Sequence, residues 1–496
     1  MASQVQADRL RLVDGFRDQW WAPLSGLLAI AVGLVLGVAL NSSLSETIVS
    51  LVFIGVGTLI TLRYPLAGLL LALVLQPFIG FAYLVVNLGS GIPDITLGRA
   101  LTLIVFSLVL VQGLFGRRLL PRVSTFDVVM ALSAFGIVLM AVRGRSITVS
   151  LQMVFDMFLT AYALYYIAKN RVTDQWTLAT VLWTVTFIGA YCGLYGIFTQ
   201  MTGISLFLPD GQLFLINEQW YTENLRLMRG LLDSPHIFGT VYGLAIPIQF
   251  YLLIKARTPQ ARLLAGLFLL LTLGGLFFTY RRTSYLAAGA GLLVLYACLP
   301  RFRRLFVPLL IGIGFVAWLY TDEIGESALL RERVGQRAET FNGRTELWNT
   351  ALRYAAREPW LGYGNAVYLR RSGLQAIESH YLWLMVDGGL LAIVPFVLMF
   401  IMMTVTGLKL YRARGTGLFV EPDLVAAFFA ALATYLVNLT TAVINHDYPH
   451  QLFFILAGAI IGTHEAGLIR LRQSIATAPS LDSALPPVTA PAHTGD

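Results

Sequence analysis

The stretch YLWLMVDGGLLAIVPFVLMFIMMTVTGL, residues 381–408, carries a single charged side chain, Asp387. Apolar runs of about 20 residues match the thickness of a bilayer core. Backbone in lipid must satisfy its own hydrogen bonds, so such runs are helices. Comparable runs recur along all 496 residues, which are 57% hydrophobic and 12% charged with a mean hydropathy of +0.72. We therefore predict an all-α polytopic membrane protein.

About 14 transmembrane helices are predicted, over residues 21–40, 46–62, 65–88, 97–115, 125–142, 147–168, 176–200, 235–254, 262–280, 284–299, 304–320, 381–408, 423–442 and 450–468. The 65–88 run is long, and we expect it to tilt or break at Pro77. The chain then divides into a cytoplasmic segment (1–20), eleven helices (21–320), a large external loop (321–380), three helices (381–468) and a disordered cytoplasmic tail (469–496). No signal-peptide cleavage site follows the first run.

The distribution of basic residues predicts the orientation of the chain. With a cytoplasmic N-terminus, the inside segments hold 20 of the 35 Lys and Arg residues, including every lysine. Both termini are therefore expected in the cytoplasm. In such a protein the net charge of +8 gives no reason to expect a nucleic-acid partner. Cys192 and Cys298 both lie in apolar runs, which argues against a disulfide framework or a zinc site.

The basic residues predicted outside are all arginines, and they are exceptions to the preference of basic residues for the cytoplasmic side. They are Arg99, Arg143, Arg145, Arg226, Arg229, Arg281, Arg282 and eight in the large loop. A guanidinium group is always charged and matches phosphate or carboxylate in shape. Lipid headgroups or acidic side chains are one explanation for any single arginine. The clusters predict an anionic ligand such as a pyrophosphate, and a structural ion pair between Arg99 and Asp156 is also expected.

The external loop carries the remaining motifs. Residues 344–357 have the spacing of an amphipathic helix, with Leu347, Ala351 and Tyr354 on one face and Trp348 beside them. Pro359 ends this helix, and residues 361–364 form a turn. Such a helix would lie along the interface as a roof over a cavity, or serve as an ordinary interfacial helix.

His380 immediately precedes the predicted span 381–408, at the membrane edge. An imidazole can accept a proton near neutral pH, which suits activation of a sugar hydroxyl. Glu378 or Asp387 would orient the ring, or Asp387 would cap a helix turn. His236, His446 and His450 are predicted on the same side, and a structural role is the alternative for each histidine.

Together these residues resemble the superfamily of bacterial O-antigen ligases and O-antigen or exopolysaccharide polymerases. The resemblance spans residues 225–400, and its motifs are Arg229-Gly230 before Pro235-His236, Arg282-Thr283-Ser284, Gly343-Arg344 with Trp348, the 359–364 turn, His380 with Leu382, and Gly388-Gly389. Three positions depart from the family pattern. Tyr381 and His236 stand where the family has Asn, and Arg281 where it has Ser.

The resemblance implies a glycosyltransferase that moves a polyprenyl-diphosphate-linked glycan onto an acceptor hydroxyl at the outer face of the membrane. The donor is the lipid-linked oligosaccharide, the acceptor is a glycan or a lipid-linked glycan, and no cofactor or metal is implied. His380 is then the expected base, and Arg229 and Arg282 are expected to bind the diphosphate in an inverting displacement. Further substrate contacts are expected from Arg226, Arg281, Arg344, Trp348, Glu378 and His236.

Polymerase and ligase share this chemistry and differ in the acceptor, which is a repeat unit, a lipid A core sugar or a protein side chain. The number of spans and the Arg-rich loop favour a polymerase slightly. A lipid-linked oligosaccharide flippase is the alternative of another class, although no two-fold repeat is evident. A cell-wall glycan polymerase is a third possibility, for which a catalytic acid is expected in the loop.

Overall fold

The computed structural model describes residues 54–80, 85–86, 95–115, 123–202, 204–205, 214–215, 231–232, 234–304, 308, 337–372, 377, 379–412, 420–441 and 447–476. The predicted span 21–40 and nearly all of the span 304–320 lie outside these residues. So do the N-terminal segment and the last part of the tail.

Helices make up most of the described residues. They are an initial helix over Ile54–Arg63, α4 (Pro65–Leu75), α5 (Leu97–Phe115), α6 (Thr125–Val142), α7 (Ile147–Val154), α8 (Thr160–Arg171), α9 (Gln175–Thr202), α10 (Pro235–Lys255), α11 (Pro259–Phe277), α12 (Arg282–Cys298), α16 (Arg337–Ala355), α17 (Val367–Ser372), α18 (His380–Arg412), α19 (Pro422–Thr441) and α20 (Asp447–Ala476). A 3₁₀ turn, η1 (Gln76–Gly80), follows α4. A π-helical turn, η3 (Phe155–Leu159), joins α7 to α8.

Two small antiparallel hairpins, which the sequence analysis did not predict, complete the described structure. Strand β1 (Val85–Val86) pairs with β2 (Ile95–Thr96), so that Val85 faces Thr96. Strand β3 (Ile204–Ser205) pairs with β4 (Phe214–Leu215), so that Ile204 faces Leu215.

Eight helices in the described residues are long and apolar enough to cross a membrane, which makes the chain a multi-pass membrane protein. The α6 helix has the bounds predicted for the span 125–142. The continuous helix Ile147–Arg171 contains the span predicted at 147–168. The long run from residue 65 is interrupted as expected, because α4 gives way to η1 next to Pro77. The count of 14 stays a prediction.

The last helix is longer than predicted. Residues 469–476 are helical, where the sequence analysis placed the start of a disordered tail. The residues after Gly467 are mostly Leu, Ile, Arg, Gln and Ala, several of which favour helix, and no proline interrupts them before Pro479. The helix α20 therefore continues beyond its apolar part.

Helices pack closely where one of them offers a glycine. A Cβ atom on Gly458 of α20 would lie 2.3 Å from the carbonyl oxygen of Tyr165 in α8, and Gly136 of α6 would meet Leu391 of α18 at 2.4 Å. Small residues of this kind let backbones approach inside membranes, where van der Waals contact drives helix association. The pairs α8 and α20, and α6 and α18, are accordingly neighbours.

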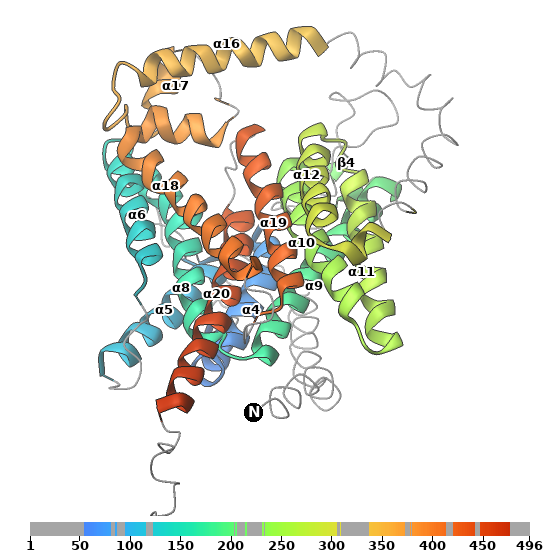
Figure 1. Cartoon of the computed structure of the whole chain (residues 1–496). Coiled ribbons are helices and arrows are strands. Elements are labelled where there is room, and N and C mark those ends of the chain that lie inside the picture. The colour runs from blue at the N-terminus through green and yellow to red at the C-terminus, as the bar shows by residue number, and fades with distance from the viewer. Residues whose placement is uncertain are drawn as a thin grey trace, which may run out of the picture.

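The helix α16 lies across the top of the view, over the ends of the other helices (Figure 1). The ends of α6, α10, α11 and α12 near residues 142, 235, 277 and 282 belong to this side, which we call the α16 end. The predicted helix 344–357 is thus present, and it begins earlier, at Arg337.

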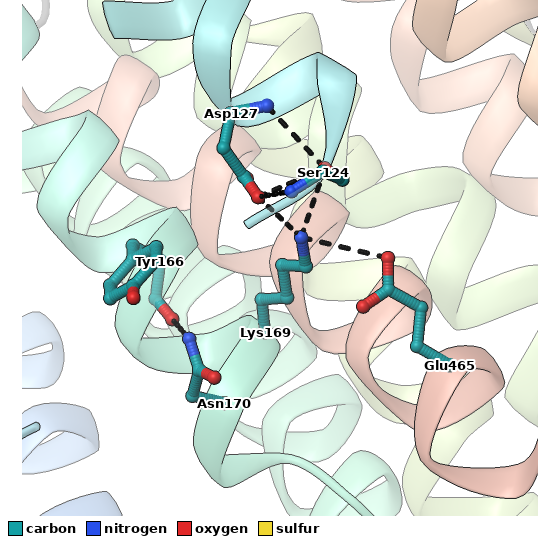
Figure 2. Close-up of polar contacts among 6 residues, drawn as sticks. All are labelled: Ser124, Asp127, Tyr166, Lys169, Asn170 and Glu465. Carbon is teal, nitrogen blue, oxygen red and sulfur yellow. Dashed lines mark hydrogen bonds and ion pairs between the residues drawn. The ribbon is translucent and has the colours of Figure 1, made fainter. Parts of the chain in front are cut away.

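A buried ionic cluster ties three helices together at the opposite end of the bundle (Figure 2). Lys169 of α8 is fully buried, and its Nζ lies 2.6 Å from Asp127 Oδ2 of α6 and 3.6 Å from Glu465 Oε1 of α20. The Lys169 ammonium also donates to Ser124 Oγ at 3.0 Å. Ser124 and Asp127 form the capping box that starts α6, so the cap and the ion pair share one carboxylate.

Replacing Lys169 by Met should lower the stability of the purified protein by about 3 kcal/mol, because Asp127 would stay buried without its cation. Thermal unfolding in detergent measures this loss. Adding Asp127→Asn to the Lys169→Met variant should restore part of the lost stability. Lys255→Met is the matched control, since Lys255 and its partners Glu421 and Asp423 are partly exposed and its melting temperature should change little. Equal shifts in the two single variants would contradict the role given to the buried cluster.

Candidate functional site

The helix α18 is two segments joined by a bend at Gly389, whose φ of 63° and ψ of −165° are not helical. The second segment, residues 390–412, is roughly 35 Å long at 1.5 Å per residue, enough to cross a bilayer alone. His380 therefore begins a short first segment that precedes this crossing. The bend also leaves two helical hydrogen bonds unmade, from Leu390 to Val386 and from Leu391 to Asp387.

The turn 359–364 supplies partners for all four of these backbone groups. Leu390 N–H donates to Pro359 O at 2.8 Å, and Leu391 N–H donates to Trp360 O at 3.2 Å. From the other direction, Val386 O accepts from Tyr363 N–H at 3.0 Å, and Asp387 O accepts from Gly364 N–H at 2.8 Å. Buried backbone groups must be paired, so the turn and the bend require each other.

Glycines make this contact possible. A Cβ on Gly389 would lie 2.5 Å from the backbone of Trp360, and a Cβ on Gly362, which has a φ of 59°, would lie 2.5 Å from the backbone of Asp387. The motifs 359–364 and Gly388-Gly389, which are 24 residues or more apart in the sequence, are therefore two halves of one joint.

Asp387 belongs to this joint and does not orient His380. Its Oδ2 accepts from the backbone N–H of Ala366 at 3.0 Å, and Ala366 has an unfavourable φ of 60°. Both ring nitrogens of His380 lack a hydrogen-bond partner among the described residues. The orienting role that we expected for Asp387 is wrong, and its alternative role in holding a turn fits these contacts.

Two of the arginines predicted on the outer side donate hydrogen bonds to groups of the protein itself. Arg143 Nη1 donates to Leu361 O at 2.7 Å, and so holds the turn against the end of α6. Arg99 donates to both carboxylate oxygens of Asp156, at 2.6 and 2.5 Å. The structural pair expected between Arg99 and Asp156 is confirmed.

His380 is fully buried inside the protein. Its ring lies 5.1 Å from Trp383, 5.7 Å from Phe158 of η3 and 5.7 Å from Phe396, measured between centroids. The ring of His450 in α20 is 5.3 Å away. The sequence analysis did not foresee this enclosure, because a hydropathy window cannot separate the segment 380–388 from the crossing that follows.

A second group of basic side chains gathers where α10 and α12 begin. His236 stands at the start of α10, and its Nδ1 is 3.2 Å from Thr283 Oγ1 in the first turn of α12. The charges of Arg281, the N-cap residue of α12, and Arg344, on α16, both act on this imidazole. Arg281 and Arg344, from segments that lie far apart in the sequence, thus bring two positive charges next to His236 at the α16 end.

Arg281 faces this group more directly than Arg282. The Nε of Arg281 is buried and has no hydrogen-bond partner among the described residues, whereas Arg282 is exposed. The sequence analysis preferred Arg282 because of the family pattern. Successive residues at the start of α12 point in different directions, so the two arginines have different surroundings. Trp348 of α16 also keeps a buried, unpartnered Nε1 in the described structure.

Three predicted site residues, Arg226, Arg229 and Glu378, lie outside the described residues. Within the described part of the chain, no three His, Cys, Asp or Glu side chains gather as metal ligands do. Thr283 was not singled out as a ligand contact by the sequence analysis. The sequence signal that could have identified Thr283 is its position directly after two arginines.

Residues 267–397 match the family model described as O-antigen ligase. This match confirms the predicted superfamily. It contains Arg281, Arg282, Arg344 and His380, together with the joint between the 359–364 turn and Gly389. His236 precedes it, and His450 follows it. No curated protein matches the chain.

Replacing Gly389 by Ala should destabilise the protein and reduce activity, because the new Cβ meets the Trp360 backbone in a conformation that disfavours side chains. Gly343→Ala is the matched control, since nothing lies within 4 Å of its Cβ position on α16. Thermal unfolding in detergent should give a lower midpoint for the Gly389 variant and no decrease for the Gly343 variant. A Gly389 variant as stable as the parent would contradict the contact.

Proposed function

We propose that the protein is a membrane glycosyltransferase of the bacterial inner membrane, acting on its outer face. The donor is a glycan linked to polyprenyl diphosphate, and the acceptor is a hydroxyl group on another glycan. The proposal rests on the O-antigen ligase match and on one observation, the gathering of His236, Arg281 and Arg344 where α10 and α12 begin.

The diphosphate of the donor would bind to this basic group. Arg281 Nε is a buried donor with no partner in the described structure, so a bound anion would supply the hydrogen bond that this donor lacks. A thiol, an amine or a neutral sugar would not neutralise the positive charges of Arg281 and Arg344, whereas a diphosphate would. When the Thr283 hydroxyl donates to Nδ1 of His236, the ring proton is on Nε2, which can then donate to a phosphate oxygen.

In the proposed reaction, His380 takes the proton of the acceptor hydroxyl while its oxygen bonds to the anomeric carbon of the donor. The bond from that carbon to the diphosphate breaks, and its electron pair leaves with the diphosphate. Attack opposite to the leaving group inverts the anomeric centre. Fixed positive charges stabilise the charge that grows on the leaving group, so the reaction as proposed needs no nucleotide sugar, cofactor or metal.

His380 suits the base better than His236. Both nitrogens of His380 lack partners in the described structure, whereas Nδ1 of His236 is already next to Thr283. The helix α16 links the two histidines. It carries Arg344 toward His236, and it packs against α18, which begins at His380. We propose that α16 and Trp348 hold the glycan over the site.

We favour a polymerase of O-antigen or exopolysaccharide repeat units, with a ligase acting on lipid A core or protein as the second candidate. Glycans from a strain lacking the chain distinguish them. Single repeat units still attached to their carrier indicate a polymerase, whereas complete unattached chains indicate a ligase. Purified protein that moves labelled lipid-linked glycan across liposomes without forming a glycosidic bond would indicate a flippase.

Arg281→Gln should lower transfer by at least about 100-fold, because a charged donor to the leaving group is lost. Arg282→Gln is the matched control and should stay close to the parent, since that side chain is exposed. Polyprenyl diphosphate released by each purified variant from membranes of the deletion strain measures the rate. A greater loss in the Arg282 variant would overturn the assignment of Arg281.

His380→Ala should lose nearly all product while it still inserts in the membrane and purifies intact. Replacing the imidazole removes a base that is worth about 100-fold to 10,000-fold in such reactions. The assay of released polyprenyl diphosphate described for Arg281→Gln measures this loss of product. Full activity in this variant would reject His380 as the base.

A further inference from the structure

Two apolar residues of the turn 359–364 are exposed although the turn itself is held firmly. Trp360 is 72% exposed and Leu361 is 41% exposed. Their carbonyl groups are both bonded, since Trp360 O accepts from Leu391 N–H and Leu361 O accepts from Arg143 Nη1. These contacts use the backbone of the turn and leave its two large apolar side chains uncovered.

The turn stands at the end of an exposed apolar face of α18. The crossing segment of α18 starts against the turn, because Leu390 and Leu391 are hydrogen bonded to Pro359 and Trp360. Exposed apolar side chains then follow at the spacing of one helix face, at Leu390, Val394, Leu398, Ile401 and Val405. A continuous apolar surface of this kind on a multi-pass protein is its contact with lipid. Trp360 and Leu361 extend this lipid-facing surface beyond the end of the helix.

The length of α6 gives the depth of the turn independently. This helix has 18 residues, roughly 27 Å at 1.5 Å per residue, and the hydrocarbon core of a bilayer is about 30 Å thick. It starts at the Ser124–Asp127 capping box beside Lys169, and it ends at Arg143, which holds the turn. About one bilayer core therefore separates the buried ionic cluster from the turn, which lies where lipid headgroups begin.

The side chains around the turn fit this boundary better than water or the acyl chains. Tryptophan is enriched at membrane interfaces, because its ring is apolar and its N–H is polar. Exposed arginines, Arg143 and Arg357, flank the turn, and a guanidinium group suits the phosphate of a lipid headgroup. Glu358 is also exposed next to them, and an exposed carboxylate would be costly inside the hydrocarbon core.

We propose that Trp360 and Leu361 insert into the headgroup layer of the membrane at the α16 end. The partner of this surface is the bilayer that α6 and α18 cross. The turn 359–364 thus rests on lipid through its side chains while its backbone holds the bend at Gly389. The inference is independent of the proposed function.

Nitroxide labels on the full-length chain, reconstituted in vesicles of phosphatidylethanolamine and phosphatidylglycerol, test this placement. Cys192→Ala and Cys298→Ala first remove the two cysteines, and Trp360→Cys then carries the label. Its exposure to oxygen, which concentrates in lipid, is compared with its exposure to a water-soluble nickel complex. We expect the label at 360 to collide more with oxygen and less with nickel than a label in water does.

Two further labels, made one at a time in the same background, supply the reference values. Arg353→Cys lies on the exposed polar side of α16 and reports water, whereas Ile401→Cys lies on the exposed face of α18 and reports the acyl chains. A label at 360 that meets as much nickel as the label at 353 overturns the inference. A label at 360 as deep as the label at 401 also overturns it, because the turn would then lie inside the core.

Tryptophan fluorescence provides a second measurement, should the label at 360 disturb the fold. The parent and Trp360→Phe are reconstituted in vesicles whose lipids carry bromine either near the glycerol or near the end of the acyl chain. The fluorescence that only the parent shows should be quenched more strongly by bromine near the glycerol. No quenching by either lipid, or stronger quenching by the deeper bromine, contradicts the inference. Neither measurement uses activity, so a failure here leaves the proposed function in place.

Discussion

Two helical hydrogen bonds that α18 does not make for itself hold the α16 end of the protein together. The bend at Gly389 opens the bonds from Leu390 to Val386 and from Leu391 to Asp387, and the turn 359–364 supplies both missing partners of each. The turn follows α16 and precedes α17, so this one joint anchors both of these helices and sets the direction in which the segment from His380 runs. The side chains of Arg143 and Asp387 add hydrogen bonds to this contact, which backbone groups otherwise make.

Hydropathy and a few local signals predicted most of the described helices. The bounds of α6 were predicted to the residue from its apolar run, and the structure adds the Ser124–Asp127 capping box at its start. The interruption near Pro77 was also foreseen, because proline cannot continue a helix without loss of a hydrogen bond. The full length of α20 was not foreseen. Its last residues include charged helix formers, which cannot be told from a solvated tail when only the length of the apolar run is considered.

The candidate site shows where such reasoning stops. Motif spacing identified the glycines of the joint, yet it gave no sign that residues 362 and 389 touch, because the contact joins backbone to backbone. Which of Arg281 and Arg282 lies beside His236 depends on where α12 begins. The enclosure of His380 by Phe158, Trp383 and Phe396 follows from packing that no sequence motif describes. Residue types suggest a chemistry, and tertiary contacts show which of these side chains lie together.

The π-turn η3 has a consequence for the length of its helix. This turn is one residue longer than an α-helical turn, and it sets the angle around the helix axis between Asp156 and Phe158. Asp156 faces Arg99 on α5, whereas Phe158 faces the imidazoles of His380 and His450. An α-helix rotates about 100° per residue, so a chain shorter by one residue here would turn one of these faces away from its partners. The segment should therefore accept substitutions far more readily than insertions or deletions, and its register is as much a part of the site as its side chains.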